Sequence, residues 1–166
     1  MPRIKNGFWN LLGVSIASLY ALYYACTSTT WHFIDSADLM FHESGHVIFL
    51  LFGEFISVCM GSGFQIFLPL FIAFYFLCHR QRISGAICLM WVGINLINVS
   101  VYAGDAIVMQ LPLLGGDGVM HDWNYILTTL DTLSSTPTVA TTLYGLGAVS
   151  IGIGIALSYF FALEQE

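Results

Sequence analysis

The sequence predicts an all-α, polytopic integral membrane protein with about five hydrophobic helical segments in a single transmembrane domain, residues 1–166. The first observation is composition: of 166 residues, 57% are hydrophobic and only 8% are charged, whereas a soluble domain carries roughly 25% charged residues. So few charges cannot cover a surface that faces water. The second observation is length, because several apolar runs approach or exceed the roughly 20 residues that a helix needs to cross a bilayer.

The hydrophobic segments are separated by breaks that contain polar residues, glycine or proline. We expect the segments at residues 8–26, 39–60, 64–78, 85–109 and 139–162. The first follows Arg3 and Lys5 and is longer than the roughly 7–15 apolar residues of a signal peptide, so we expect an uncleaved transmembrane helix. The last repeats Ala148, Gly152 and Ala156 at four-residue spacing, which predicts a close helix-packing face.

The positions of the basic residues predict an irregular segment. Arg3 and Lys5 mark one cytoplasmic end of the chain, and Arg80 and Arg82 mark a second. Three full crossings between them would place the two groups on opposite sides. One segment before Arg80 is therefore expected to be re-entrant or broken. Residues 64–78 are the candidate, because this segment is the shortest, contains a proline and follows a Gly-Ser-Gly turn.

The composition also limits the possible partners. The net charge is -6 and the chain has only four lysines and arginines, so it has no basic patch for a nucleic acid. The four cysteines are scattered and none lies in a Cys-x-x-Cys pair, so a cysteine metal or redox cluster is not expected. The partners that remain are the membrane and other membrane proteins.

The second hydrophobic segment contains a His-Glu-x-x-His motif at residues 42–46. In a helix, His42 and His46 lie one turn apart on the same face, so both imidazoles can reach one metal ion, by default zinc. Glu43 lies beside them and is the candidate general base, placed to take a proton from a metal-bound water. Because such groups are costly in lipid, a functional site is the default interpretation. The alternative is a polar helix end that is simply hydrated near the interface.

A catalytic zinc usually has three protein ligands and a water, so the motif needs a third ligand. The richest region is the stretch 110–137, where Asp117, His121 and Asp122 are candidates. His121 and Asp122 could divide the work, one binding the metal and the other orienting a ligand imidazole. Alternatively, Asp122 caps an ordinary helix over residues 123–130. If one segment before Arg80 does not cross, this stretch lies on the same side as the start of the second segment.

The fourth hydrophobic segment carries a polar stripe of residues spaced four and three apart: Trp91, Asn95, Asn98, Tyr102 and Asp105. Such a stripe should face the interior of the bundle or a cavity. Asn95 and Asn98 could bond to the backbone of a substrate or to groups behind the ligands, and Asp105 is another candidate third ligand. Alternatively, the stripe supplies hydrogen bonds between helices.

The His-Glu-x-Gly-His sequence of residues 42–46 resembles that of the site-2 proteases, the intramembrane zinc metalloproteases. The stretch His121-Asp122-Trp123-Asn124-Tyr125 is similar to one in uncharacterised bacterial membrane proteins grouped as site-2-protease-like. The resemblance implies that His42 and His46 bind zinc and that Glu43 activates water to cut a membrane-embedded helix. It also favours His121 or Asp122 over Asp117 as the third ligand.

The sequence therefore predicts an intramembrane zinc metalloprotease whose substrate is a membrane-embedded peptide segment. Two other interpretations are open: a non-enzymatic metal-binding subunit of a larger membrane complex, and a metal-dependent hydrolase that acts on something other than a peptide. We expect the protein in a bacterial inner (cytoplasmic) membrane, with its N-terminus in the cytoplasm.

Overall fold

The computed structural model describes residues 2–114 and 119–164, and it confirms the all-α fold class. The helices are α1 (Pro2–Cys26), α2 (Phe33–Phe49), α3 (Glu54–Cys78), α4 (Arg82–Gly104), α5 (Asp122–Thr129) and α6 (Thr136–Leu163). Two short 3-10 helices join them, η1 (Leu50–Phe52) before α3 and η2 (Leu133–Ser135) before α6. Among the described residues there is no β-strand.

Four stretches within the described ranges are long and apolar enough to cross a membrane. They are Gly7–Cys26, Glu54–Cys78, Arg82–Gly104 and Leu133–Leu163. These stretches indicate a membrane protein, as the composition predicts. The helix α2, which carries the His-Glu-x-x-His motif, is not among them.

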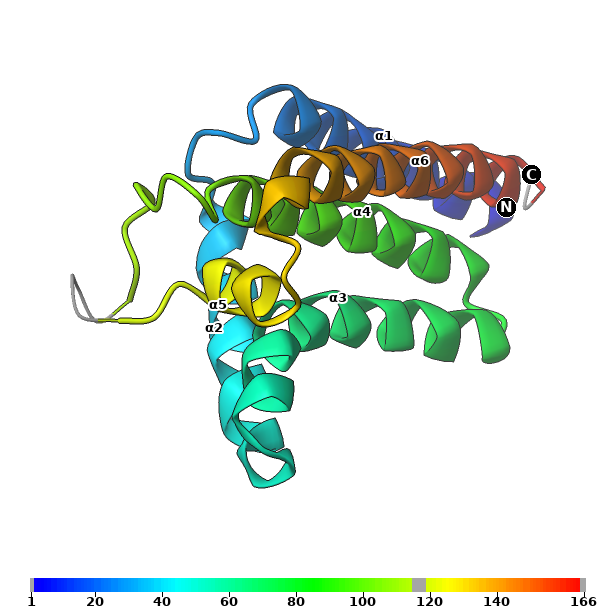
Figure 1. The fold of residues 1–166 in the computed structure, drawn as a ribbon. Coiled ribbons are helices and arrows are strands. Elements are labelled where there is room, and N and C mark those ends of the chain that lie inside the picture. Colours follow the sequence, from blue (N-terminus) through cyan, green and yellow to red (C-terminus); the bar gives the residue numbers. More distant parts are fainter. Residues whose placement is uncertain (1, 115–118, 165–166) are drawn as a thin grey trace.

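The long helices lie side by side, and α2 crosses them at one end of the bundle. Figure 1 shows α1, α4, α6 and the later part of α3 running along a common direction, with both termini near the turn between α3 and α4. An ion pair of 3.5 Å between Arg82 at the start of α4 and Glu164 after α6 joins these elements. The chain thus has two distinct ends: a basic end with the termini, and a site end with α2 and α5 (Figure 1).

Two expected segments differ from the structure. Residues 39–60 are not one helix, because the chain turns at η1 and at Gly53, whose φ of 98° is readily adopted only by glycine. Residues 64–78 are not a separate broken segment, because they continue α3 from Glu54. The element that is too short to span is α2.

The predicted Gly-Ser-Gly break is instead a bend within α3. The helix runs without interruption through residues 61–63, but Figure 1 shows its first turns lying along α2 and the rest turning to run beside α4. Glycine and serine pairs are a common cause of such kinks. The bend places residues 57–65 of α3 next to α2, where the motif lies.

The packing face of α6 is not the one that the sequence predicts. Ala148, Gly152 and Ala156 are exposed, and no atom lies within 4 Å of a Cβ placed at Gly152. The buried face instead contains Gly147, where a Cβ would lie 2.7 Å from the carbonyl oxygen of Gly93 in α4. Two small-residue patterns overlap on this helix, and only contact with α4 distinguishes them.

We expect Gly147→Val to lower the stability of the protein in detergent by about 1–3 kcal/mol, because the added side chain overlaps the backbone of α4. Gly152→Val is the matched control, since the same change in the same helix meets open space. Thermal unfolding of both variants measures the difference. Equal melting temperatures would contradict this α4–α6 contact.

Candidate metal centre

The two histidines of the motif are held against the bend of α3 by a close helix contact. His42 and His46 lie on the face of α2 that packs on α3, and Gly45 lies between them. A Cβ at Gly45 would overlap the carbonyl oxygen of Met60, so only glycine permits this approach. The small residue that the motif carries before its second histidine therefore has a packing role here.

The third polar group comes from α5, far along the chain. His121 is the N-cap of this helix, and its Nδ1 accepts a hydrogen bond from the backbone N–H of Asn124. The backbone N–H of Asp122 donates to the Tyr102 hydroxyl of α4 at 3.1 Å, and the Trp123 indole N–H donates to Ser62 Oγ of α3 at 3.1 Å. These contacts attach the start of α5 to α3 and α4, and so orient the Asp122 carboxylate.

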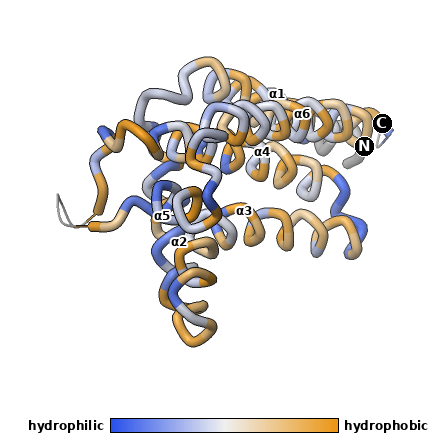
Figure 2. The backbone as a smooth tube through the Cα atoms, viewed as in Figure 1, coloured by the Kyte–Doolittle hydropathy of each residue, from blue (hydrophilic) through white to orange (hydrophobic). Residues whose placement is uncertain are grey.

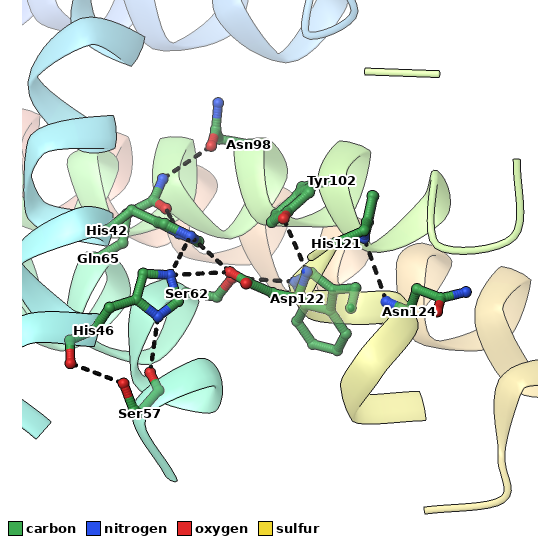
Figure 3. Close-up of polar contacts among 11 residues, drawn as sticks. His42, His46, Ser57, Ser62, Gln65, Asn98, Tyr102, His121, Asp122 and Asn124 are labelled. Carbon is green, nitrogen blue, oxygen red and sulfur yellow. Dashed lines mark hydrogen bonds and ion pairs between the residues drawn. The ribbon is translucent and has the colours of Figure 1, made fainter. Parts of the chain in front are cut away.

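Three side-chain atoms from α2 and α5 converge in one place, as Figure 3 shows. Asp122 Oδ2 lies 2.8 Å from His42 Nε2 and 3.1 Å from His46 Nε2. The two Nε2 atoms are 3.1 Å apart. Ligand atoms placed about 2.0–2.1 Å from a tetrahedral zinc are roughly 3.3 Å from one another. The observed triangle is close to that size, so this group could hold a metal ion.

The hydrogen bonds behind the histidines determine which ring nitrogen faces the triangle. His46 Nδ1 lies 3.0 Å from the backbone carbonyl oxygen of Ser57. A carbonyl only accepts, so Nδ1 carries the proton, and in a neutral ring Nε2 then has the free lone pair. Ser57 Oγ also donates to the backbone oxygen of His46 at 2.8 Å. This ring is therefore fixed in the tautomer that a metal requires.

His42 is oriented by a relay of amides that crosses three helices. Its Nδ1 lies 3.3 Å from Gln65 Oε1, and Gln65 Nε2 donates to Asn98 Oδ1 at 2.9 Å. Asn98 Nδ2 donates in turn to the Asp35 carboxylate and to the Tyr24 hydroxyl, both at 3.1 Å. Because a carboxylate only accepts, every amide in the relay has one direction, and His42 Nε2 is left with the lone pair.

The site therefore brings two nitrogen lone pairs and a carboxylate oxygen within 2.8–3.1 Å of one another. Burial favours the neutral acid, but when the His42 and His46 rings carry protons at Nε2, their contact with the carboxylate outweighs burial and holds the pKa of the Asp122 carboxyl below its usual value. Three acceptors this close repel one another unless a cation lies among them. A metal ion or protons on the rings can supply that charge.

Gly61, in the bend of α3, leaves room beside the two ring nitrogens. A Cβ at this position would lie 2.5 Å from His46 Nε2 and 2.8 Å from His42 Nε2. The absent side chain thus leaves space next to both Nε2 atoms, where an ion bound to them can lie. The sequence alone predicts only a helix break at this glycine. The feature of the sequence that could have indicated the role of Gly61 is its position in the first long helix after the motif.

We expect Gly61→Ala to lower metal affinity about 10- to 100-fold. The added methyl group would push both imidazoles out of position, and the loss of a group that orients a metal ligand has an effect of this size. Gly63→Ala is the control: its nearest neighbour would be the flexible side chain of Met60, at 3.1 Å. Zinc titration of both purified variants measures the two affinities. Equal affinities would contradict the role of Gly61.

Glu43 lies beside the triangle and lines a cavity of about 460 Å³ that also reaches His42, His46 and Asp122. Its side chain is exposed, and it makes no hydrogen bond or ion pair with any described residue. The carboxylate can therefore contact a molecule in the cavity. Apolar side chains such as Leu39, Val58 and Leu111 supply much of the remaining wall.

The other candidate ligands lie away from the triangle. His121 is the cap of α5, and its Nε2 faces the Asp105 carboxylate at 3.4 Å rather than His42 or His46. Asp105 also accepts hydrogen bonds from the backbone N–H groups of Gln110 and Leu111. The alternative role of Asp122 as the cap of this helix is therefore wrong, because His121 is the N-cap. Asp117 lies outside the described residues.

The polar stripe of α4 faces the interior of the bundle, as predicted, and mostly bonds to other helices. Asn98 belongs to the relay behind His42, so its amide is already occupied. Trp91 donates to Asp38 of α2 at 2.9 Å. Asn95 is fully buried and donates to the backbone oxygen of Trp91. These contacts favour a structural role for Asn95 over contact with a substrate.

No protein-family model, curated protein or solved structure matches this chain.

Proposed function

We propose that this protein is an intramembrane zinc metallopeptidase of the site-2 protease type. The single observation that carries the proposal is the convergence of His42 Nε2, His46 Nε2 and Asp122 Oδ2, with Glu43 lining the same cavity. Two histidines with one carboxylate, plus an open position, are a known ligand set of catalytic zinc. The resemblance of residues 42–46 to the site-2 protease motif supports the same assignment.

The roles of the residues follow from their surroundings. His42, His46 and Asp122 would hold the ion, and the relay through Gln65 together with the Ser57 carbonyl would keep both rings in the metal-binding tautomer. When bound, zinc polarises a peptide carbonyl and lowers the pKa of a water molecule.

Glu43 would accept the proton of that water at its carboxylate and then deliver it to the leaving amine. Its lack of a hydrogen-bonded partner within the described structure suits this work, because the carboxylate can turn towards a water molecule in the cavity. The largely apolar cavity fits a peptide segment drawn from a membrane helix. Such a segment must unwind locally, since the peptide bonds of a helix are shielded.

The proposal is tested by removing and restoring the metal. The protein, purified and reconstituted into lipid vesicles, should contain about one zinc ion per chain. It should cleave at least one of a panel of fluorogenic transmembrane peptides, whose helices are weakened by glycine or proline. A chelator should abolish cleavage, and stoichiometric zinc should restore it.

The possible results separate the proposed function from its alternatives. Zinc-loaded protein that cleaves none of the peptides contradicts the peptidase assignment and favours a metal-binding subunit. Protein that binds no zinc contradicts the metal centre itself.

A further inference from the structure

The basic residues of this chain all lie at one end of the bundle. The four lysines and arginines are Arg3, Lys5, Arg80 and Arg82. The first two belong to the opening turn of α1, and the others lie at the turn from α3 to α4. Figure 1 shows the N-terminus at the same end of the bundle as this turn, and the Arg82–Glu164 ion pair brings the end of α6 to the start of α4. The site end of the described structure therefore has no basic residue except histidine.

The acidic residues have the opposite distribution. Among the acidic residues that the structure describes, only Glu164 lies at the basic end. The remaining acids of the described ranges belong to α2, the start of α3, the end of α4, and α5 with its following turn: Asp35, Asp38, Glu43, Glu54, Asp105, Asp122 and Asp131. Figure 2 shows hydrophilic stretches at both ends of the bundle, separated by apolar helix. The two ends of the described bundle therefore carry opposite charge and are separated by apolar helix.

Segments rich in lysine and arginine remain in the cytoplasm, and this bias sets the orientation of a membrane protein. If α2 does not cross, α1 and α3 are the only two spans between Arg3 and Arg80, and both basic groups are on one side. We infer that the basic end is cytoplasmic and that the metal centre lies at the opposite, non-cytoplasmic boundary of the membrane.

The hairpin formed by α2, η1 and the first turns of α3 shows how the site is held at this boundary. Its tip consists of apolar, exposed residues: Val47, Ile48, Leu50, Leu51 and Phe52. Leu51 is 95% exposed, and no charged residue occurs between Glu43 and Glu54. An exposed apolar patch of this kind needs a partner, and the surfaces of the neighbouring spans already face lipid.

The occupant of this surface is lipid, because the hairpin crosses the direction of the spans at the site end (Figure 1). A helix in this orientation lies in the plane of the membrane, with its apolar side among the acyl chains. His42 and His46 are on the other side of α2, towards α3 and α5. The hairpin thus lies between the lipid and a cavity whose lining includes the loop residues Thr29, Thr30 and Leu113 at the site end.

This location narrows the substrate class, a step that rests on the proposed function. The substrate is a membrane protein segment that reaches the non-cytoplasmic boundary, such as the end of a transmembrane helix. A segment whose only unwound bonds lie at the cytoplasmic boundary would not reach Glu43 and the ligands.

Two native cysteines provide a matched test. Cys26 ends α1 at the site end, Cys78 ends α3 at the basic end, and both are exposed. Variants that keep one of them, with the other three cysteines replaced by serine, are treated in intact cells with a membrane-impermeant maleimide. We expect Cys26 to be labelled, and Cys78 to be labelled only after the cells are opened. The reverse pattern, or equal labelling of both in intact cells, overturns the inference.

A second pair covers the case in which a native thiol does not react. Thr29→Cys and Gln81→Cys place exposed thiols at the same two ends of a chain without other cysteines, and the same labelling pattern is expected.

The lipid contact of the hairpin is tested separately with a fluorophore on Leu51→Cys, which brominated lipids should quench. A fluorophore on Thr29→Cys should not be quenched. An unquenched Leu51 label overturns the lipid contact. Neither labelling nor quenching depends on metal or cleavage. Failure of the proposed function would therefore appear in zinc content or peptide cleavage and would leave both of these measurements unchanged.

Discussion

Asp122→Asn should weaken zinc binding by at least about 100-fold, which is the largest effect that we expect on the metal centre. Changing a group that only orients a ligand costs about 10- to 100-fold in affinity, and Asp122 itself lies 2.8 Å and 3.1 Å from the two histidine nitrogens. Asparagine keeps the shape of the side chain but removes its negative charge. Isothermal titration of the purified, chelator-treated protein with zinc measures the change.

His121→Asn is the control for this experiment. Asparagine is a good N-cap, so the start of α5 should be preserved, while the imidazole of His121, next to Asp122, is lost. We expect zinc affinity to stay within a few-fold of the natural protein. If His121→Asn abolishes binding and Asp122→Asn does not, the third ligand is His121, and the arrangement in Figure 3 changes when metal binds.

Glu43→Gln should lower the rate of peptide cleavage by about 100- to 10,000-fold, the range that general base catalysis contributes. Glutamine has the same size but cannot accept the proton of a water molecule. Zinc affinity should stay nearly unchanged, because Glu43 is not part of the triangle of His42, His46 and Asp122. The measurement is single-turnover cleavage of the reporter peptide in vesicles, together with the zinc content of the same preparation.

Glu54→Gln is the matched control for Glu43→Gln. Glu54 is also an exposed carboxylate on the hairpin, but it lies at the start of α3 and does not line the cavity. We expect its cleavage rate to equal that of the natural protein. Unchanged cleavage in Glu43→Gln would refute the general-base role, and a structural metal subunit would show no cleavage in any of the variants.

Much of the fold could be predicted from composition and local pattern. A chain with 8% charged residues has to place its apolar helices in lipid, and this physical requirement does not depend on any particular contact. The spacing of His42 and His46 follows from the helical repeat alone, since residues four apart share a face. The sequence could also point to the region of residues 121–122 as the source of a third group, because polar clusters are rare in this chain.

Other features depend on how the helices approach one another. Sequence patterns did not distinguish a break from a bend at residues 61–63, because glycine and serine permit both, and packing of α3 against both α2 and α4 selects the bend. The same holds for α6, where contact with α4 buries Gly147 and leaves Gly152 exposed.

The sequence by itself determined the membrane class, the helical content and the pair of histidines, because each follows from composition or from the period of one helix. Only the tertiary structure decided between His121 and Asp122, since adjacent residues point in different directions once α5 is attached to Tyr102 and Ser62. It also revealed the relay from Asp35 to His42. A hydrogen bond needs two groups within about 3 Å, and no spacing along the chain specifies that.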